Sequence, residues 1–125
     1  MRFAVVGSRR YPFLHRVRAA VRGIAAGYPD AVIVSGGARG VDRVAEQQAE
    51  ACGLGIDIIR PDWGTHGKRA GILRNAEIVR RADRVIAFWD GVSRGTKSTS
   101  DMARKAGKPT TVFGVYGDDH EGDDL

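Results

Sequence analysis

Short apolar runs alternate with amphipathic stretches along almost the whole chain. The apolar runs are rich in Val and Ile and occupy residues 3–7, 31–35, 56–61, 84–90 and 110–115. Between them, apolar residues recur at intervals of three and four, the spacing of one helix face, over about 12–27, 41–52, 70–82 and 96–107. The pattern predicts five strands connected by four helices.

This strict alternation predicts an α/β fold. Consecutive strands joined through helices run parallel, and helices then cover both faces of the sheet. The predicted strands are nearly all apolar, as expected of strands buried on both faces. We therefore expect a single Rossmann-like, doubly wound, mostly parallel five-stranded sheet with helices on both faces, formed by residues 1–117. Residues 118–125, DDHEGDDL, are expected to be an acidic disordered tail.

The net charge of +5 is unevenly distributed. The acidic tail contains five of the 15 acidic residues and no Lys or Arg, so the residues before it carry ten more basic than acidic side chains. A basic body indicates an anionic partner, such as a nucleotide, a nucleic acid or phosphate. The tail is interpreted as a solvated end, and masking of a basic site is the alternative.

Several classes of protein are disfavoured by composition. Cys52 is the only cysteine, which fits a reducing cytoplasm, so we expect a cytoplasmic protein. No apolar run approaches the roughly 18 residues of a membrane span, and we expect no membrane partner. The histidines, His15, His66 and His120, have no cysteine partners at zinc spacing, so no metal site is expected.

The turns that follow the predicted strands carry the functional signal. They read GSRR at 7–10, SGGARGVD at 35–42 and DGVSRGT at 90–96. Ligands of doubly wound sheets bind outside the carboxyl ends of the strands. Glycine allows backbone N–H groups to approach an anion, the next helix adds its positive N-terminal end, and arginine adds bidentate hydrogen bonds. These turns predict a phosphate-binding site, whereas tight turn geometry alone is the simpler interpretation.

The candidate ligand-binding residues of these turns combine glycines, hydroxyls, arginines and one carboxylate. They are Gly7, Ser8, Arg9, Ser35, Gly36, Gly37, Arg39, Gly40, Asp42, Gly95 and Thr96. Asp42 opens a predicted helix, where a carboxylate either caps the helix or accepts a hydrogen bond from a ribose hydroxyl.

A basic, glycine-rich segment at 63–71 is interpreted as a mobile surface loop that could fold over a ligand. Trp63 would stack on a base or pack the loop down, and Lys68 would reach a phosphate. Arg74 and Asn75 follow one turn inside the next predicted helix, as part of the site or of a solvated first turn.

The chain lacks GxGxxG, GxxxxGK[ST] and GxSxG, which disfavours standard NAD, ATP-hydrolysing and serine-hydrolase sites.

Taken together, these segments resemble the SLOG superfamily. The resemblance rests on GSR at 7–9, SGGARGVD at 35–42, PDW at 61–63, HGKRAGILRN at 66–75 and ADRVIAFWD with SRGT up to residue 96. It covers residues 2–115 and is closest to the YspA/YpsA-related branch. It implies a Rossmann-like fold whose glycine-rich turns, with Arg74 and Asn75, bind a nucleotide or a nucleotide-derived ligand. It also implies a homodimer, as is common in this superfamily.

Two other branches supply alternative functions. The LOG phosphoribohydrolases cleave an N-glycosidic bond with an arginine and a glutamate. By similarity Arg74 falls on the arginine, but Thr99 stands at the glutamate position and Asp101 is the nearest carboxylate, so Arg74 and Asp101 are the candidate catalytic residues. The DprA branch binds single-stranded DNA. The hypotheses are thus nucleotide binding without catalysis, LOG-like hydrolysis, and DprA-like binding of single-stranded nucleic acid. No particular cofactor is predicted beyond a nucleotide or nucleotide-derived ligand.

Overall fold

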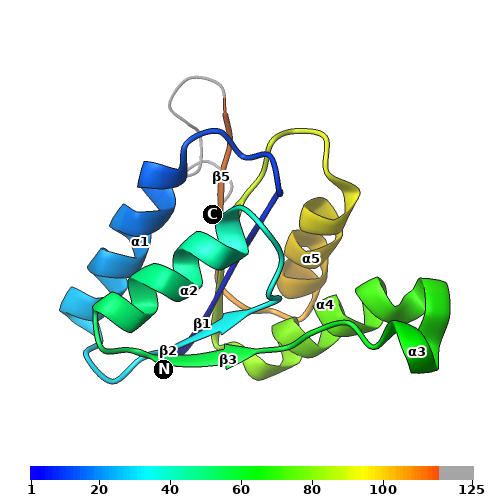
Figure 1. Ribbon diagram of the computed structural model, residues 1–125, viewed down its shortest axis with the longest axis horizontal. Helices are drawn as coiled ribbons and strands as arrows, with labels where there is room; N and C mark the ends of the chain where they lie inside the picture. The colour runs from blue at the N-terminus through cyan, green and yellow to red at the C-terminus, as the bar shows by residue number, and fades with distance from the viewer. Residues whose placement is uncertain (116–125) are drawn as a thin grey trace.

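The computed structural model describes residues 1–115 as one five-stranded, wholly parallel sheet (Figure 1). The strands are β1 (Arg2–Gly7), β2 (Val32–Ser35), β3 (Gly55–Ile58), β4 (Arg84–Phe88) and β5 (Thr110–Phe113). The helices are α1 (Leu14–Gly27), α2 (Val41–Ala51), α3 (Trp63–His66), the 3-10 turn η1 (Gly67–Arg69), α4 (Ala70–Arg81) and α5 (Arg94–Lys105). The predicted α/β, doubly wound fold is confirmed. The predicted acidic tail at 118–125 lies outside the described residues.

The strand order β3-β2-β1-β4-β5 places β1 at the centre of the sheet. The chain builds outward from β1 through β2 to β3 and then crosses back to add β4 on the other side of β1. The order therefore reverses between β1 and β4, which pair in register from Phe3 with Arg84 to Gly7 with Phe88. Such a reversal leaves a crevice at the carboxyl ends of the two strands.

Alternate residues of β1 enter two separate cores. Phe3 and Val5 pack with α1 and α2, whereas Ala4 and Val6 pack with α4 and α5. This period of two is the geometry of a strand covered on both faces. Figure 1 shows α1 and α2 together on one side of the sheet. The predicted burial on both faces therefore holds for the central strand.

The edge strand β3 departs from that prediction. Ile56 and Ile58 remain 38 % and 37 % exposed, because β3 pairs with β2 alone. The strand also ends at Ile58 instead of residue 61. Pro61 lacks the N–H that a longer ladder would need.

Residues 63–69, interpreted from the sequence as a loop, are helical. Asp62 starts α3, and its Oδ1 accepts a hydrogen bond from the Thr65 N–H at 3.1 Å. The turns of α3 and η1 lead directly into α4 and project from the body of the domain (Figure 1). The glycines within this segment concealed its helical character, since glycine is a poor helix former.

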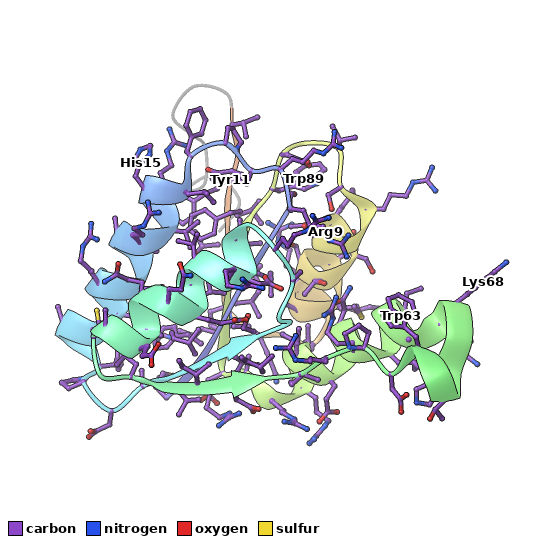
Figure 2. All side chains as sticks on the ribbon, viewed as in Figure 1. Arg9, Tyr11, His15, Trp63, Lys68 and Trp89 are labelled. Atoms are coloured by element: carbon purple, nitrogen blue, oxygen red, sulfur yellow. The ribbon has the colours of Figure 1, made fainter. Side chains whose placement is uncertain are left out.

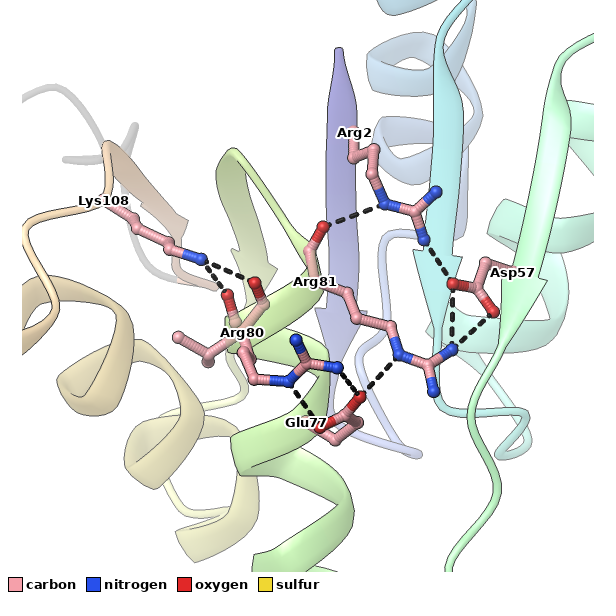
Figure 3. A network of polar contacts seen from close by, with 7 residues as sticks. Arg2, Asp57, Glu77, Arg80, Arg81 and Lys108 are labelled. Atoms are coloured by element: carbon pink, nitrogen blue, oxygen red, sulfur yellow. Dashed lines mark hydrogen bonds and ion pairs between the residues drawn. The ribbon is translucent and has the colours of Figure 1, made fainter.

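A polar network ties the strands together at the edge of the sheet opposite the crevice (Figure 3). Asp57 of β3 forms ion pairs with Arg2 of β1 and with Arg81 at the end of α4. Arg2 Nε also donates to the Arg81 carbonyl at 2.9 Å. Lys108 Nζ donates to the carbonyls of Arg80 and Ala82 at 3.0 and 2.7 Å, which satisfies the end of α4. These charged side chains are held in contacts within the domain. The arginines at the carboxyl ends of the strands are different residues.

Candidate functional site

A cleft of about 340 Å³ opens at the carboxyl edge of the sheet, where the strand order reverses. The turns after β1, β2 and β4 line it, together with the middle of α4 and the first turn of α5. Its volume falls within the range of small-molecule sites. Seven of the predicted residues line it: Gly7, Arg9, Asp42, Arg74, Asn75, Gly95 and Thr96.

The turn after β1 lies tightly against its neighbours. A Cβ atom at Gly7 would stand 2.7 Å from the Phe88 carbonyl oxygen and 2.7 Å from Val41 Cγ2. Ser8 is buried, its Oγ accepts a hydrogen bond from the Asp90 N–H at 3.1 Å, and it lies 3.3 Å from Thr96 Oγ1. Ser8 therefore connects the turn after β1 to the turn after β4 and to α5.

The glycines after β2 make room for other parts of the site. Gly40 has a φ of 77°, and a Cβ there would lie 2.5 Å from the Arg9 carbonyl oxygen. Gly37 has a φ of 74° and its carbonyl accepts from Arg60 Nη1 at 3.4 Å. These conformations and contacts favour glycine strongly. Ser35 points elsewhere, because its hydroxyl donates to Glu46 Oε2 at 2.6 Å.

Asp42, in the first turn of α2, is 5 % exposed and lines the cleft. Its Oδ2 accepts a hydrogen bond from the Ala38 N–H at 3.1 Å. Within residues 1–115, its Oδ1 has no hydrogen-bond partner. Burial raises the pKa of Asp42 to about 6. The hydrogen bond from Ala38 and the charge of Arg74 lower this pKa, and the charge of Glu46 raises it by a smaller amount. The smallest effect, from the Gly36 backbone, lowers the pKa of Asp42.

Arg74 reaches across the cleft from the first half of α4. Its Nε donates to Asn75 Oδ1 at 2.8 Å, and its Nη1 donates to the Gly36 carbonyl at 2.7 Å. Burial lowers the pKa of Arg74, the Asp42 charge opposes this, and Arg9 adds to the lowering. A guanidinium remains charged at neutral pH all the same. Arg74 thus places a fixed positive charge beside the turn after β2.

Arg9 and Arg10 bring exposed positive charge to the same cleft. Both side chains are exposed, and neither forms an ion pair with a residue in the described part of the chain. Figure 2 shows Arg9 between the end of β1 and α5. Arg39 lies beside these two arginines outside the main cleft.

The turn after β4 lines the cleft with the carboxylate of Asp90, which already accepts hydrogen bonds from its own turn. Asp90 Oδ1 accepts from the N–H groups of Val92 and Ser93 at 2.9 and 2.8 Å. Burial raises the pKa of Asp90, but these two hydrogen bonds and a further one with Ser8 outweigh it and lower the pKa overall. Ser93 caps α5 by accepting from the Thr96 N–H at 3.4 Å. Asp90 is therefore an organising residue of this turn.

Ser8, Ser35, Gly36, Gly37, Arg39 and Gly40 belong to the turns around the cleft without lining it. Three other predicted residues lie on different surfaces of the domain. Trp63 is 58 % exposed on α3, and Lys68 belongs to the adjacent η1. Figure 2 shows both on the projecting segment, with Lys68 extending away from the domain. Asp101 lies on the outer side of α5, where it forms an ion pair with Lys97 at 2.8 Å. Neither a stacking Trp63 nor a catalytic Asp101 is brought to the cleft in this conformation.

Thr99, which stands at the position of the LOG glutamate, does line the cleft. Its hydroxyl donates to the Gly95 carbonyl at 2.9 Å, as is common for threonine within a helix. Of the residues described, the carboxylates that line the cleft are Asp42 and Asp90.

Sequence reasoning did not single out Arg10, Asp90 and Ser93 as site residues. All three lie in turns that the sequence had already marked by their glycines, so their position after a strand was the available signal. Their individual roles depend on the paths of those turns.

In the part of the chain described by the structure, no three His, Cys, Asp or Glu side chains are grouped for a metal ion. No helix there is long and apolar enough to cross a membrane.

Comparison with known proteins gives a family match and a close relative. Residues 1–66 match the YspA, cpYpsA-related SLOG family. The Gene 61 protein of Mycobacterium phage D29 is 45 % identical over 89 residues, which is 66 % of this chain and 71 % of the phage protein.

Solved structures share the fold at lower identity. DNA processing protein A (DprA) from Helicobacter pylori superposes with a TM-score of 0.76 at 24 % identity, covering 99 % of this chain and 70 % of that one. DprA from Streptococcus pneumoniae gives 0.75 at 22 % identity, covering 97 % of this chain and 52 % of that one. The structure of TM1055 gives 0.69 at 23 % identity, covering 88 % and 72 %.

Proposed function

The chain belongs to the YspA, cpYpsA-related SLOG family, and from this premise we propose that its cleft binds a nucleotide or nucleotide-derived ligand through the phosphate. The observation that carries the proposal is the convergence of Arg9, Arg10 and Arg74 on one glycine-lined cleft at the reversal of strand order. Guanidinium groups bind phosphate through paired, charge-assisted hydrogen bonds. Exposed arginines at the end of a parallel sheet are therefore suited to an anionic ligand.

Two helix termini support the same proposal. Both α2 and α5 begin at the cleft, at Val41 and Arg94. The N-terminus of a helix carries a partial positive charge, and its first N–H groups lack partners within the helix. A phosphate held between these termini and the arginines would experience positive potential from several directions.

Binding without hydrolysis is favoured over the LOG-like alternative. N-glycosidic cleavage needs a group that transfers a proton or stabilises a cationic sugar. Asp101 pairs with Lys97 outside the cleft, and Asp90 is occupied by backbone N–H groups. If the chain were nevertheless a hydrolase that uses Asp101, incubation with AMP would release adenine, and Asp101→Asn would abolish that release. We expect no free base from either protein.

Binding of single-stranded DNA is the second candidate function. DprA from Helicobacter pylori, which shares the fold, binds single-stranded DNA. In this chain, Arg39 lies beside Arg9 and Arg10 and widens the basic surface at the cleft. Binding through phosphates alone would weaken steeply with salt and would not be displaced by a mononucleotide.

A thermal-shift screen separates these functions. AMP, ADP-ribose, NAD, cyclic nucleotides and a short single-stranded DNA would each be added to the purified protein and to Arg9→Ala. Ligand at 100 times its Kd should stabilise the fold by about 2.7 kcal/mol, a shift of several degrees. Arg22→Ala, an exposed arginine of α1 away from the cleft, is the matched control.

We expect a nucleotide to raise the melting temperature of the wild type and of Arg22→Ala, and to have a much smaller effect on Arg9→Ala. A shift with DNA alone would favour the second candidate function. If no compound shifts the melt, the proposal of a phosphate-binding cleft is wrong.

Self-association into a homodimer is a further part of the proposal. The projecting segment and the start of α4 expose three large apolar side chains, Trp63, Ile72 and Leu73, which are 58 %, 63 % and 37 % exposed. Exposed apolar clusters of this kind are typical of protein contacts. The segment is therefore the surface on which we expect two copies to meet.

A further inference from the structure

We propose that Asp42 selects the ligand of the cleft: its Oδ1 accepts a hydrogen bond from a ribose hydroxyl, so that a ribonucleotide-type ligand binds and its deoxy counterpart does not. This inference rests on the proposed function of the cleft and specifies the class of ligand. The structural basis is a buried carboxylate oxygen that lacks a partner and belongs to a side chain lining the cleft.

The two oxygens of Asp42 are not equivalent. Oδ2 accepts from the Ala38 N–H at 3.1 Å and thereby holds the turn after β2 against the start of α2. Oδ1 has no hydrogen-bond partner among the described residues, although the side chain is 5 % exposed and lines the cleft. Buried polar atoms in native proteins are nearly always hydrogen-bonded. An ionised carboxylate can only accept, and we propose that a ligand bound in the cleft that Asp42 lines supplies the donor for Oδ1.

The neighbouring polar side chains have other partners. Arg74 directs Nη1 to the Gly36 carbonyl and Nε to Asn75 Oδ1. Glu46, on the same helix as Asp42, accepts from the Ser35 hydroxyl. The hydrogen bonds of Arg74 and Glu46 thus leave Oδ1 without a partner from either side chain.

The charges of the cleft determine which ligand chemistry fits. Arg9 and Arg10 line it from the turn after β1 and suit an anionic group. The N–H groups at the start of α2 attract an anion, but a phosphate placed directly against the Asp42 carboxylate would be repelled. A fitting ligand therefore carries its phosphate toward the arginines and an uncharged hydrogen-bond donor toward Asp42. A ribose hydroxyl on a nucleotide provides this arrangement, whereas inorganic phosphate does not.

Protonation of Asp42 should modulate this selection. The charged groups around it are Glu46 on its own helix, Arg74 from α4, Arg9 and Arg10 from the turn after β1, and Asp90 from the turn after β4. Burial raises the pKa of Asp42 to about 6. Above that pH, the carboxylate accepts a charge-assisted hydrogen bond, which is stronger than a neutral one. Below it, the discrimination against a deoxy ligand should decline.

The test compares ligands that differ by one hydroxyl. The affinities of AMP, GMP, CMP and UMP, each with its 2′-deoxy and 3′-deoxy forms, would be measured by isothermal titration calorimetry at pH 7.5. For the nucleotide that binds most tightly, we expect one of its two deoxy forms to bind at least about tenfold more weakly than the ribonucleotide. Without that hydroxyl, the buried and charged Oδ1 of Asp42 has no hydrogen-bond donor. Measurement at pH 5 with the 5′-methyl ester, whose phosphate does not titrate there, should give a smaller ratio.

Variants assign the effect to Asp42. Asp42→Asn keeps the shape of the side chain and an acceptor for the Ala38 N–H, but it makes the bond to the ligand a neutral one, so the ratio between hydroxyl and deoxy ligands should shrink. Glu50→Gln, an exposed acidic residue of the same helix, should retain the wild-type ratio. Thermal melts of both variants establish that they fold, and the wild-type ligand series does not depend on any variant.

The outcomes distinguish this inference from the proposed function. If the wild type binds both deoxy forms as tightly as the ribonucleotide, or if Asp42→Asn retains the full ratio, Asp42 does not select the ligand, yet nucleotide binding stands. If the wild type binds no nucleotide, the proposed function fails and the inference fails with it.

Discussion

The guanidinium of Arg74 occupies the space that a side chain at position 36 would need. Its Nη1 donates to the Gly36 carbonyl at 2.7 Å, and a Cβ atom at Gly36 would lie 2.7 Å from that nitrogen and 2.9 Å from Asp42 Oδ2. Gly36 is therefore a glycine because an arginine of α4 and a carboxylate of α2 meet over its backbone. The glycine-rich turn and the charges of the cleft form one unit.

The first prediction concerns this contact. Gly36→Ala must displace Arg74, which is held by two hydrogen bonds, or Asp42, which is buried. We expect a loss of stability of about 1–3 kcal/mol, together with weaker nucleotide binding, measured by urea unfolding and calorimetry. Gly23→Ala in α1 is the control, because a Cβ there meets nothing within 4 Å and should stabilise by up to about 1 kcal/mol. Equal effects of the two substitutions would contradict this interpretation.

The second prediction concerns the dependence of stability on pH. Burial raises the pKa of Asp42 from 3.8 to about 6 in the folded protein. Between these values the folded protein holds a proton that the unfolded chain has released, so the free energy of unfolding falls as the pH rises. Above about pH 6 this contribution of Asp42 no longer changes, and the free energy of unfolding has fallen by about 3 kcal/mol.

Urea unfolding of the wild type and of Asp42→Asn between pH 4 and pH 8 measures this effect. The stability of the variant relative to the wild type should increase from pH 4 to about pH 6 and then stay constant. Glu77, whose pKa is lowered to about 2 by hydrogen bonds from Arg80 and Arg81, is present in both proteins, so its opposite contribution cancels. A difference that does not change across this range would show that Asp42 does not titrate as described.

The sequence predicted the fold because strand and helix periodicities differ clearly. It also predicted that three glycine-rich turns meet at the carboxyl ends of the strands, where the structure has a cleft. It could not predict which group each side chain meets. Ser8 and Thr96 were predicted as ligand-binding residues, and the structure adds that their hydroxyls lie 3.3 Å apart although 88 residues separate them in the chain. Such a contact depends on the placement of β1 beside β4, which no local pattern encodes. The helical character of 63–69 was missed for a local reason, its glycines.

The third prediction follows from the position of Ser8. Its Oγ joins the Asp90 N–H to the Thr96 hydroxyl in a buried environment. Ser8→Ala leaves that N–H without its partner, and we expect a loss of about 1–3 kcal/mol in the free energy of unfolding. Ser98→Ala on α5, outside the cleft, should change stability by less than about 0.5 kcal/mol. If Ser8→Ala abolished nucleotide binding at unchanged stability, Ser8 would instead be a direct ligand contact.

The fourth prediction concerns the projecting apolar surface. Ile72 is 63 % exposed near the start of α4, beside the α3 segment that exposes Trp63. If two copies meet there, Ile72→Glu places a charge in an apolar contact, and burying an unpaired charge is costly. Light scattering coupled to size exclusion should then give the mass of a dimer for the wild type and that of a monomer for the variant. Val92→Glu, at a turn position that is 80 % exposed, introduces the same charge and should leave the dimer intact. A monomeric wild type, or a dimer that persists in Ile72→Glu, would place self-association elsewhere or exclude it, and the exposed side chains of this segment would then need a different partner.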